Sequence, residues 1–394
     1  MWYTTLDHIN GKYKLPSDRK PVDALKGLGL EFPYTASSVL GSGGSYDISR
    51  AGLLVNTIDP EVDPAYNILQ GLWFIKLKTF TEAEPEVRHI KNSNKSYEGS
   101  IAGATFAPDG SGYALYFQTK EFRKTLGSHE VFVIDLYSEE SFAIPCQTED
   151  GIALEPEGAI FSHDCKELYI TAAVKARSVL YKQKLDDKRQ KRGDLERFDL
   201  PGGVASVHSL YASLSHAPSS TNHLLLTVTS LVDPSIYMIV DPSAHMQPRM
   251  LPQPSDSGIN LGLKHSQVSE IYVKQTDKDG NDYTVHSWVM VPSDFDKSKK
   301  YPLAMAIHGG PQGAWMDAWS TRWNPAVWAE AGYVVVSPNP TGSTSFGFKY
   351  TDDVNGEWGG AAYKDIEATF DYVEKNFDFV DTSRAVLGGG SYGG

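Results

Sequence analysis

A repeated pattern of short strands occupies the first 243 residues of this 394-residue chain. One unit begins with ATFAPDG at 104–110 and continues into strands expected at 113–118 and 130–136. The next begins with GAIFSHD at 158–164 and continues into strands expected at 167–172 and 178–182. Weaker copies start at Ser45 and Ser209, so the units recur at roughly 50–55 residues, close to the length of a four-stranded propeller blade.

The repeat restricts the possible folds because a single four-stranded sheet of this length cannot bury both of its faces alone. Stacked copies cover each other, which makes such an array stable. About four copies fit between residues 36 and 243, and we therefore expect a partial β-propeller over residues 1–245. A β-sandwich with coincidental turns is the alternative.

The pattern changes beyond a segment rich in proline, serine and glycine at 246–262, which we expect to be a linker. Hairpin strands are expected at 271–275 and 283–291, and buried strands at 301–307, 333–336 and 384–387. Asn324 before Pro325 marks a helix start, and Gly332 marks its end. A second, amphipathic helix is indicated by apolar residues at helical spacing: Tyr363, Ile366, Phe370, Val373 and Phe377.

Strands that alternate with helices in this way are typical of a doubly wound parallel sheet. We therefore expect residues 263–394 to form the N-terminal part of an α/β-hydrolase catalytic domain, which ends at its nucleophile turn. The predicted fold class is thus a partial β-propeller of about four blades followed by an incomplete α/β-hydrolase domain.

The nucleophile turn is Gly389-Gly390-Ser391-Tyr392-Gly393, a G-x-S-x-G pattern directly after a predicted strand. In this context the serine lies on a sharp turn that projects its hydroxyl from the sheet, and Ser391 is predicted to be a nucleophile. Gly389 and Gly393 are expected because side chains there would collide as the chain folds back.

The second catalytic signal is His308-Gly309-Gly310-Pro311, which follows another predicted strand. Hydrolases of this kind direct two N–H donors at the developing oxyanion, and the expected donors are the backbone N–H groups of Tyr392 and Gly310. His308 is expected to shape this loop rather than to act as the base.

Several other polar and aromatic residues near these motifs could be taken for site residues. The carboxylates of Asp317, Asp352 and Asp365 are expected to lie at the surface or to cap helices. Glu155 and Glu157 form an acidic pair that only weakly suggests an amine site. Five tryptophans are expected to be mostly core, with one or two lining a substrate pocket: Trp315, Trp319, Trp323, Trp328 and Trp358.

The composition excludes some function classes. A net charge of −13 argues against binding to nucleic acid, which needs clustered basic residues. No apolar stretch has the length of a membrane span or a signal peptide, and no metal site or cofactor is predicted. Cys146 and Cys165 are the only cysteines, too few for a disulfide framework, although a single bridge between them stays an alternative.

Four segments together resemble the prolyl oligopeptidase family: HGGPQG at 308–313, WSTRWNP at 319–325, SPNPTGST at 337–344 and GSYGG at 390–394. Within that family they are most similar to the acylaminoacyl-peptidase branch and to its fungal dipeptidyl-peptidase V group. The resemblance is dense from residue 270 onward and looser over the repeats.

The resemblance implies a propeller that limits access to an α/β-hydrolase, and a peptidase that releases dipeptides from short peptides. It implies Ser391 as nucleophile, with the triad Asp and His located after it, so both are absent from this chain, which also looks cut at its start. We therefore expect the polypeptide alone to be inactive. The resemblance favours an extracellular protein, but compartment and oligomeric state stay open.

Two other function classes stay open at this stage. A carboxylesterase would share the nucleophile turn and the oxyanion loop, because a fold does not determine its substrate. A non-catalytic propeller could serve as a binding protein.

Overall fold

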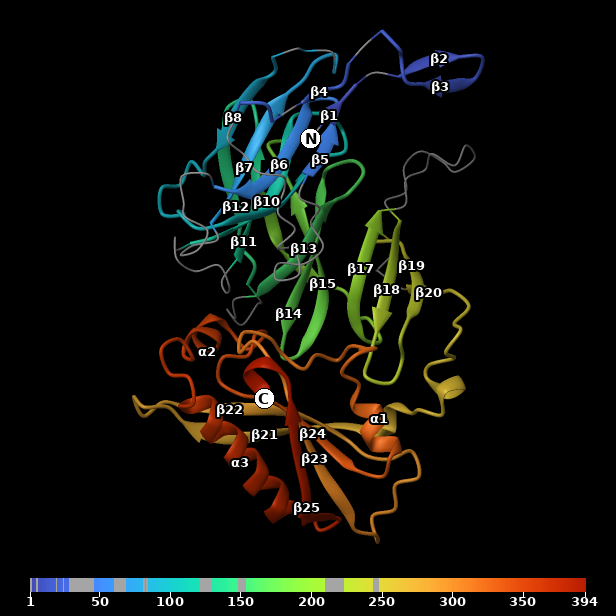
Figure 1. The fold of residues 1–394 in the computed structure, drawn as a ribbon, viewed down its shortest axis with the longest axis vertical. Coiled ribbons are helices and arrows are strands. Elements are labelled where there is room, and N and C mark those ends of the chain that lie inside the picture. The colour runs from blue at the N-terminus through green and yellow to red at the C-terminus, as the bar shows by residue number, and fades with distance from the viewer. Residues whose placement is uncertain are drawn as a thin grey trace. The chain divides into compact units, whose positions relative to one another are not determined.

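The computed structural model describes residues 2–4, 6–18, 20–23, 25–27, 46–59, 69–80, 82, 84–120, 129–147, 154–209, 223–243 and 248–394. The chain forms two compact units. The first contains Met1–Gln147, Pro156–Ile170 and Lys182–Glu196, and the second contains Thr148–Glu155, Thr171–Tyr181 and Arg197–Gly394. Figure 1 shows the elements of each unit by label.

Four antiparallel four-stranded sheets follow one another in the described part of the chain before residue 251. Within each sheet, strands that are neighbours in sequence are paired. The four sheets are β5–β8 (Tyr46–Ser49, Gly52–Ile58, Gln70–Lys76, Glu86–Ile90), β9–β12 (Ile101–Phe106, Tyr113–Thr119, His129–Asp135, Glu140–Ile144), β13–β16 (Glu155–Phe161, Glu167–Val174, Arg177–Leu185, Lys191–Arg197) and β17–β20 (Gly203–Ser209, Leu224–Thr229, Ile236–Val240, Pro248–Met250).

The predicted repeat units correspond to these sheets. The strands expected at 113–118 and 130–136 are β10 and β11, and those expected at 167–172 and 178–182 are β14 and β15. The start of the repeat near residue 36, and residues 210–222 of the copy that begins at Ser209, lie outside the described residues. The rest of that copy contains β18 and β19.

Facing sheets in the first unit bury one another, as the repeat predicts. Apolar residues of β6 and β7 form one core cluster with residues of β9, β10 and β11. Its large members are almost fully buried: Leu54, Leu72, Phe74, Tyr116, Phe132 and Ile134. This packing covers faces that neither sheet could bury alone. Two short antiparallel pairs accompany it, β1 (Trp2–Tyr3) with β4 (Val22–Asp23) and β2 (Asp7–Ile9) with β3 (Lys12–Lys14).

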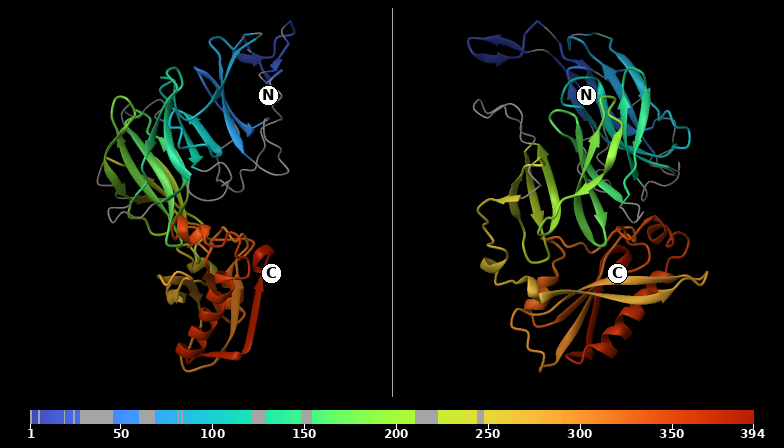
Figure 2. Two further views of the ribbon diagram at one scale, coloured as in Figure 1. Left: turned by 90° about the vertical axis from the view of Figure 1, so that its left-hand side faces the viewer. Right: turned by 180° about the vertical axis from the view of Figure 1, so that it is seen from behind.

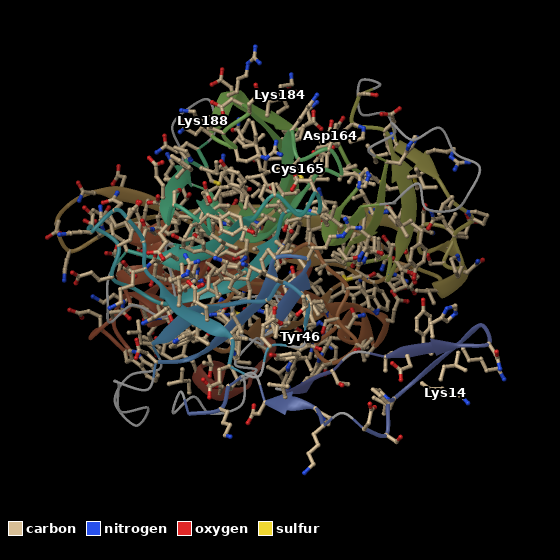
Figure 3. The ribbon with its side chains drawn as sticks, turned by 90° about the horizontal axis from the view of Figure 1, so that it is seen from above. Lys14, Tyr46, Asp164, Cys165, Lys184 and Lys188 are labelled. Carbon is tan, nitrogen blue, oxygen red and sulfur yellow. The ribbon has the colours of Figure 1, made fainter. Side chains whose placement is uncertain are left out.

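Both cysteines are buried free thiols, so the alternative of a Cys146–Cys165 disulfide is wrong. Cys165 lies beside Asp164 on the turn between β13 and β14 (Figure 3). Burial raises the pKa of the Cys146 thiol to about 12 and that of Cys165 to about 11. Neither thiol is therefore ionised near neutral pH.

The second unit contains a five-stranded sheet of order β21-β22-β24-β23-β25. Its strands are β21 (Val268–Thr276), β22 (Asp282–Met290), β23 (Tyr301–Ile307), β24 (Val334–Asn339) and β25 (Val380–Gly389). β24, β23 and β25 are parallel, whereas β21 and β22 form the predicted hairpin and β22 pairs antiparallel with β24. The sheet is therefore mixed rather than wholly parallel.

Side chains of β23 and β24 alternate between two cores on opposite faces of this sheet. Leu303 and Met305 join one core with Val373 of α3 (Ala361–Asn376). Ala304 joins the other core with Ala326 of α1 (Pro325–Glu330). Because successive side chains of a strand point to opposite faces, α1 and α3 cover different faces of the sheet, as Figures 1 and 2 show.

Two predictions about the helices can be compared with the structure: the cap of α1 and the buried face of α3. The Asn324 side chain accepts a hydrogen bond from the Ala326 N–H, so it caps α1 as predicted. Four of the five apolar residues predicted for the buried face of α3 are confirmed, since Val373 lies in the core and Ile366, Phe370 and Phe377 pack against it. Tyr363 is the exception, at 56% exposed, and the buried residues of α3 also include Asp365 and Thr369. Tyr363 lies one position beyond the face that contacts the sheet.

The remaining helical elements are short: α2 (Phe348–Asp352) and the 3-10 turns η2 (Ile259–Leu261), η3 (His265–Gln267) and η4 (Ser391–Gly393). The range 246–262, predicted as linker, includes β20, which pairs with β19 and extends the fourth sheet to Met250. Within the described residues, no helix has the length and apolar character needed to cross a membrane.

Candidate active site

Ser391 lies on the turn that joins β25 to η4, and its φ is +58°. Positive φ is uncommon for a residue with a side chain, and it is the strained conformation that the G-x-S-x-G pattern predicts. A Cβ at Gly389 would lie 2.1 Å from the Gly393 carbonyl oxygen, and one at Gly393 would lie 2.3 Å from that of Ile307. Only glycine fits at these two positions.

The loop after β23 lies directly against this turn. β23 and β25 are parallel neighbours in which Ile307 is the register partner of Gly389, so both strands end at the same edge. A Cβ at Gly309 would lie 2.9 Å from the Gly390 carbonyl oxygen and 3.3 Å from the Ser391 Cβ. Gly310 has φ +128° and precedes Pro311 through a cis peptide bond. The structure thus brings together the two loops that the sequence singled out.

His308 uses both ring nitrogens within its own surroundings. Nδ1 lies 2.8 Å from the Gly309 carbonyl oxygen and Nε2 lies 2.9 Å from the Ser343 hydroxyl. A carbonyl can only accept, so Nδ1 donates to Gly309. The Ser343 hydroxyl beside Nε2 donates its own proton to the Pro340 carbonyl at 2.6 Å. Burial lowers the pKa of His308 and so disfavours the charged ring. The ring therefore braces the loop.

Asp365 and Asp317 differ from the expectation of surface or capping carboxylates. Asp365 is fully buried and accepts hydrogen bonds from the Thr341 N–H and hydroxyl, at 2.7 and 2.6 Å, and from Tyr283 at 2.7 Å. Asp317 accepts from the Leu231 N–H at 3.0 Å. Burial raises the pKa of both carboxyls. Each one fixes a loop, while Asp352 lies at the end of α2.

A cavity of about 480 Å³ opens beside Ser391. Its lining is mainly apolar and aromatic, and comes from β23, the segment 314–323 and the nucleophile turn. The lining residues are Leu231, Ile307, His308, Gly309, Ala314, Trp315, Met316, Ala318, Trp319, Ser320, Arg322, Trp323, Gly390 and Ser391. Cavities of this size and character are typical of small-molecule and peptide sites.

The tryptophans were only partly predicted. Three of them line the cavity, Trp315, Trp319 and Trp323, rather than the one or two expected. None of the five is buried: Trp328 is 50% exposed and Trp358 is 68% exposed. Trp358 packs edge-on against Tyr392, with ring centres 5.0 Å apart, so it contacts the nucleophile turn instead of the core.

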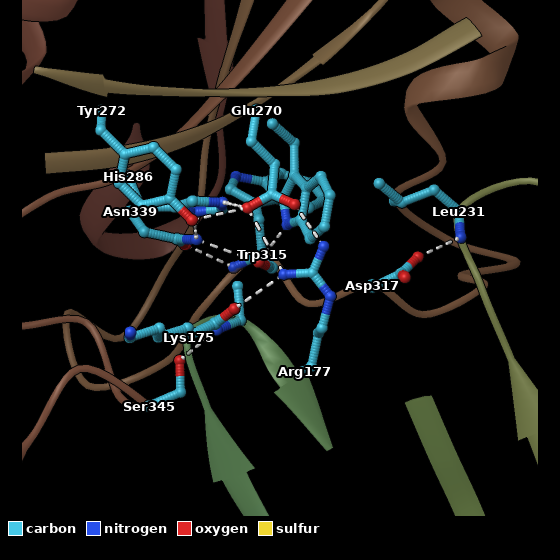
Figure 4. A network of polar contacts seen from close by, with 12 residues as sticks. Lys175, Arg177, Leu231, Glu270, Tyr272, His286, Trp315, Asp317, Asn339 and Ser345 are labelled. Atoms are coloured by element: carbon cyan, nitrogen blue, oxygen red, sulfur yellow. Dashed lines mark hydrogen bonds and ion pairs between the residues drawn. The ribbon is translucent and has the colours of Figure 1, made fainter. Parts of the chain in front are cut away.

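Asn339 holds the backbone of Trp315 at the wall of this cavity, a contact that the sequence did not indicate (Figure 4). The Asn339 Oδ1 accepts from the Trp315 N–H at 2.7 Å, and Nδ2 donates to the Trp315 carbonyl at 3.0 Å. The same Nδ2 lies 3.0 Å from Nδ1 of His286, the register partner of Asn339 in β22. Polar residues at positions expected to be buried in these two strands, His286 and Asn339 among them, were the only available signal.

The network continues from His286 to charged residues. Because an amide N–H₂ can only donate, Nδ1 of His286 accepts, and Nε2 donates to Glu270 at 3.2 Å. Glu270 also pairs with Arg177 of β15 and accepts from Tyr272 at 2.7 Å. Although burial alone would raise the pKa of Glu270, the hydrogen bonds from Arg177 and Tyr272 hold it below its usual value.

This network makes the stability of the second unit depend on pH. His286 is 1% exposed, and burial lowers its pKa from 6.5 to about 4, although Glu270 opposes the shift. The unfolded chain then binds a proton that the folded chain resists, so this contribution is complete above pH 6.5 and is lost as pH falls toward 4. We expect the free energy of unfolding to fall by about 2 kcal/mol across that window.

Urea unfolding followed by tryptophan fluorescence at several pH values measures the effect. His286→Gln is expected to flatten the fall, whereas His265→Gln, which changes an exposed histidine, should leave it unchanged. A His286→Gln curve parallel to that of the parent protein would contradict the assignment.

Comparison with known proteins shows a family resemblance over the C-terminal part of the chain. Residues 319–394 match the model described as prolyl oligopeptidase family. This range contains the nucleophile turn and four of the five tryptophans expected near the site: Trp319, Trp323, Trp328 and Trp358. Residues 319–394 of the chain are therefore similar to the prolyl oligopeptidase family.

Curated relatives of the chain are named dipeptidyl-peptidase 5. The chain is 33% identical over 368 residues to the probable dipeptidyl-peptidase 5 of Arthroderma benhamiae, and 33% identical over 368 residues to the dipeptidyl-peptidase 5 of Trichophyton schoenleinii. Each alignment covers 92% of this chain and 47% of the relative. The chain therefore spans about half the length of the curated relatives it matches.

The fold is shared with solved structures of peptidases. The acylaminoacyl peptidase of Pyrococcus horikoshii aligns with a TM-score of 0.62 and 17% identity over 88% of this chain and 48% of its own. A puromycin-hydrolyzing peptidase of Mycobacterium tuberculosis aligns with a TM-score of 0.57 and 15% identity over 90% of this chain and 48% of its own. These alignments support a propeller combined with an α/β-hydrolase domain.

Proposed function

We propose that this chain is part of a serine-type peptidase that hydrolyses short peptides, in the manner of a dipeptidyl-peptidase, through an acyl-enzyme on Ser391. The observation that carries the proposal is the conformation of Ser391, whose φ of +58° places it at the end of β25 against the Gly309 loop. The family match and the relatives named dipeptidyl-peptidase 5 support a peptide substrate.

The proposed roles follow from the geometry of the two loops. The backbone N–H groups of Tyr392 and Gly310 stabilise the oxyanion that forms when Ser391 attacks the carbonyl. Gly309, Gly389 and Gly393 allow the loops to approach closely. His308 supports the oxyanion loop rather than acting as base, since both of its nitrogens are engaged with Gly309 and Ser343.

The four sheets are proposed to be consecutive blades of the propeller, which would admit short peptides and exclude folded proteins. The proposed propeller part is residues 1–245 together with β20, which ends at Met250. Residues 251–262 are the proposed linker, and residues 263–394 are the proposed catalytic part. Acyl transfer through a serine requires no cofactor. An esterase would use the same loops, but the names of the relatives favour peptides.

A fluorophosphonate probe tests the proposal, because it reacts with serines activated by a base. The protein purified from its natural source is treated with the probe, digested, and analysed by peptide mass spectrometry. We expect the label on the peptide that contains Ser391. A label on a different serine, or none while a known serine peptidase reacts in parallel, would overturn the assignment of Ser391.

A further inference from the structure

We propose that the cavity beside Ser391 binds a carboxylate of the substrate, and that Arg322 is the residue that pairs with it. The inference rests on the proposed function, because it adds a substrate preference to the same site. The part of the substrate in question is the one that lies in the tryptophan-lined cavity. The free amino terminus of the substrate is proposed not to bind there.

Arg322 is held close to the nucleophile by an aromatic ring. A Cβ at Gly390 would lie 3.3 Å from Cζ2 of Trp323, so this ring packs against the residue that precedes Ser391. The Arg322 guanidinium lies over the same ring, 5.4 Å from its centre, a distance typical of a cation–π contact. The Ser320 hydroxyl accepts from the backbone N–H groups of Arg322 and Trp323 at 3.2 and 2.9 Å, which fixes the turn that carries both side chains.

The charges around the cavity have one sign. Among the described residues that line it, Arg322 is the only one with a permanent charge, and none is an Asp or Glu. Two other arginines of the second unit have carboxylate partners: Arg177 pairs with Glu270, and Arg384 with Asp381. For Arg322 the described residues provide no such partner, so its guanidinium donors are available to a ligand.

This arrangement decides which end of a peptide fits the cavity. An ammonium group needs a carboxylate, and the described lining offers only a cation, so the amino terminus would be repelled. A guanidinium forms charge-assisted hydrogen bonds with carboxylates, often two at once. Consecutive Cα atoms are ~3.8 Å apart, so a carboxylate one or two residues from the scissile bond reaches the rim of the site.

Two sources supply that carboxylate: the free C-terminus of a short peptide, and an Asp or Glu side chain. The tryptophan rings of the lining would contact an aromatic or aliphatic side chain next to it. The preferred substrates are therefore short peptides that combine an apolar residue with a nearby carboxylate on the leaving side.

Binding to the Ser391→Ala protein tests the inference without turnover. Three ligands are titrated and followed by tryptophan fluorescence: a tripeptide acid ending in phenylalanine, its C-terminal amide, and an amide with glutamate before the phenylalanine. We expect the acid to bind about five- to tenfold more tightly than the simple amide, as for a partly exposed charge-assisted pair. Recovery of affinity by the glutamate peptide would assign a side-chain source as well as the C-terminus.

Arg322→Gln in the same protein should reduce the ratio between acid and amide to about one, and Arg322→Lys should restore part of it because the charge returns. Arg249→Gln, which removes an exposed arginine of β20, is the matched control and should keep the full ratio. Arg322 is exposed, and thermal unfolding of each variant confirms an intact fold.

Three outcomes would overturn the inference: equal binding of acid and amide by the parent, a preference that survives Arg322→Gln, or no binding of any of the three peptides. The proposed function is judged separately by the fluorophosphonate label. A labelled Ser391 with no acid preference rejects only the carboxylate site, and an acid preference without labelling rejects only the peptidase.

Discussion

Replacing Ser391 by alanine is expected to lower kcat/KM for a chromogenic dipeptide amide by about five to six orders of magnitude. The hydroxyl is the atom that forms the acyl-enzyme, and no neighbouring group replaces it in that role. The oxyanion donors proposed here, the N–H groups of Tyr392 and Gly310, would remain in the variant. They account for the residual rate, because they still favour attack by water on a bound peptide.

The assay uses protein purified from its natural host with the substitution introduced there. Ser383→Ala is the matched control: this exposed serine also lies on β25, and its hydroxyl donates to Asp381 at 2.6 Å. We expect its kcat/KM to stay within about twofold of the parent value, as for most surface substitutions. A Ser391→Ala protein that retains more than about a tenth of the activity would show that the nucleophile lies elsewhere.

The predictable part of the site consists of features that are local in sequence. The turn around Ser391 and the loop at Gly309 are each determined by a few adjacent residues that follow a strand. Their meeting was also predictable, since the carboxyl ends of parallel strands share one edge of a sheet. The strands of the repeats and the Asn324 cap are also determined by residues that are adjacent in sequence, and both agreed with the prediction.

The features that were missed depend on residues far apart in the chain. Arg177, Glu270 and Asn339 are separated by tens of residues, and only the fold brings them into one network. The exposure of Trp358 and Tyr363 likewise depends on which segments pack against them. The spacing of apolar or aromatic residues in the sequence carries no information about those segments. A polar residue in a buried strand, such as His286, signals that a partner exists without identifying it.

Asn339→Leu is expected to lower the free energy of unfolding of the second unit by about 3 kcal/mol. Asn339 is fully buried, and leucine has the same number and branching of side-chain heavy atoms but no polar atoms. The Trp315 N–H and the His286 Nδ1 would lose their partners, and each unsatisfied buried group costs about 1–3 kcal/mol. The Trp315 carbonyl keeps one hydrogen bond, from the Trp288 indole at 2.9 Å, which limits the loss.

Urea unfolding at pH 7 followed by tryptophan fluorescence measures this change, since Trp288 and Trp315 both contact the network. Asn355→Ala is the control, because Asn355 is exposed and its side chain contacts only Gln312 among the described residues. We expect less than about 0.5 kcal/mol for the control. If Asn339→Leu costs no more than this control, Asn339 does not hold the Trp315 backbone. The cavity wall would then owe its position to the apolar contacts of Met316 and Trp319 with the cores of the second unit.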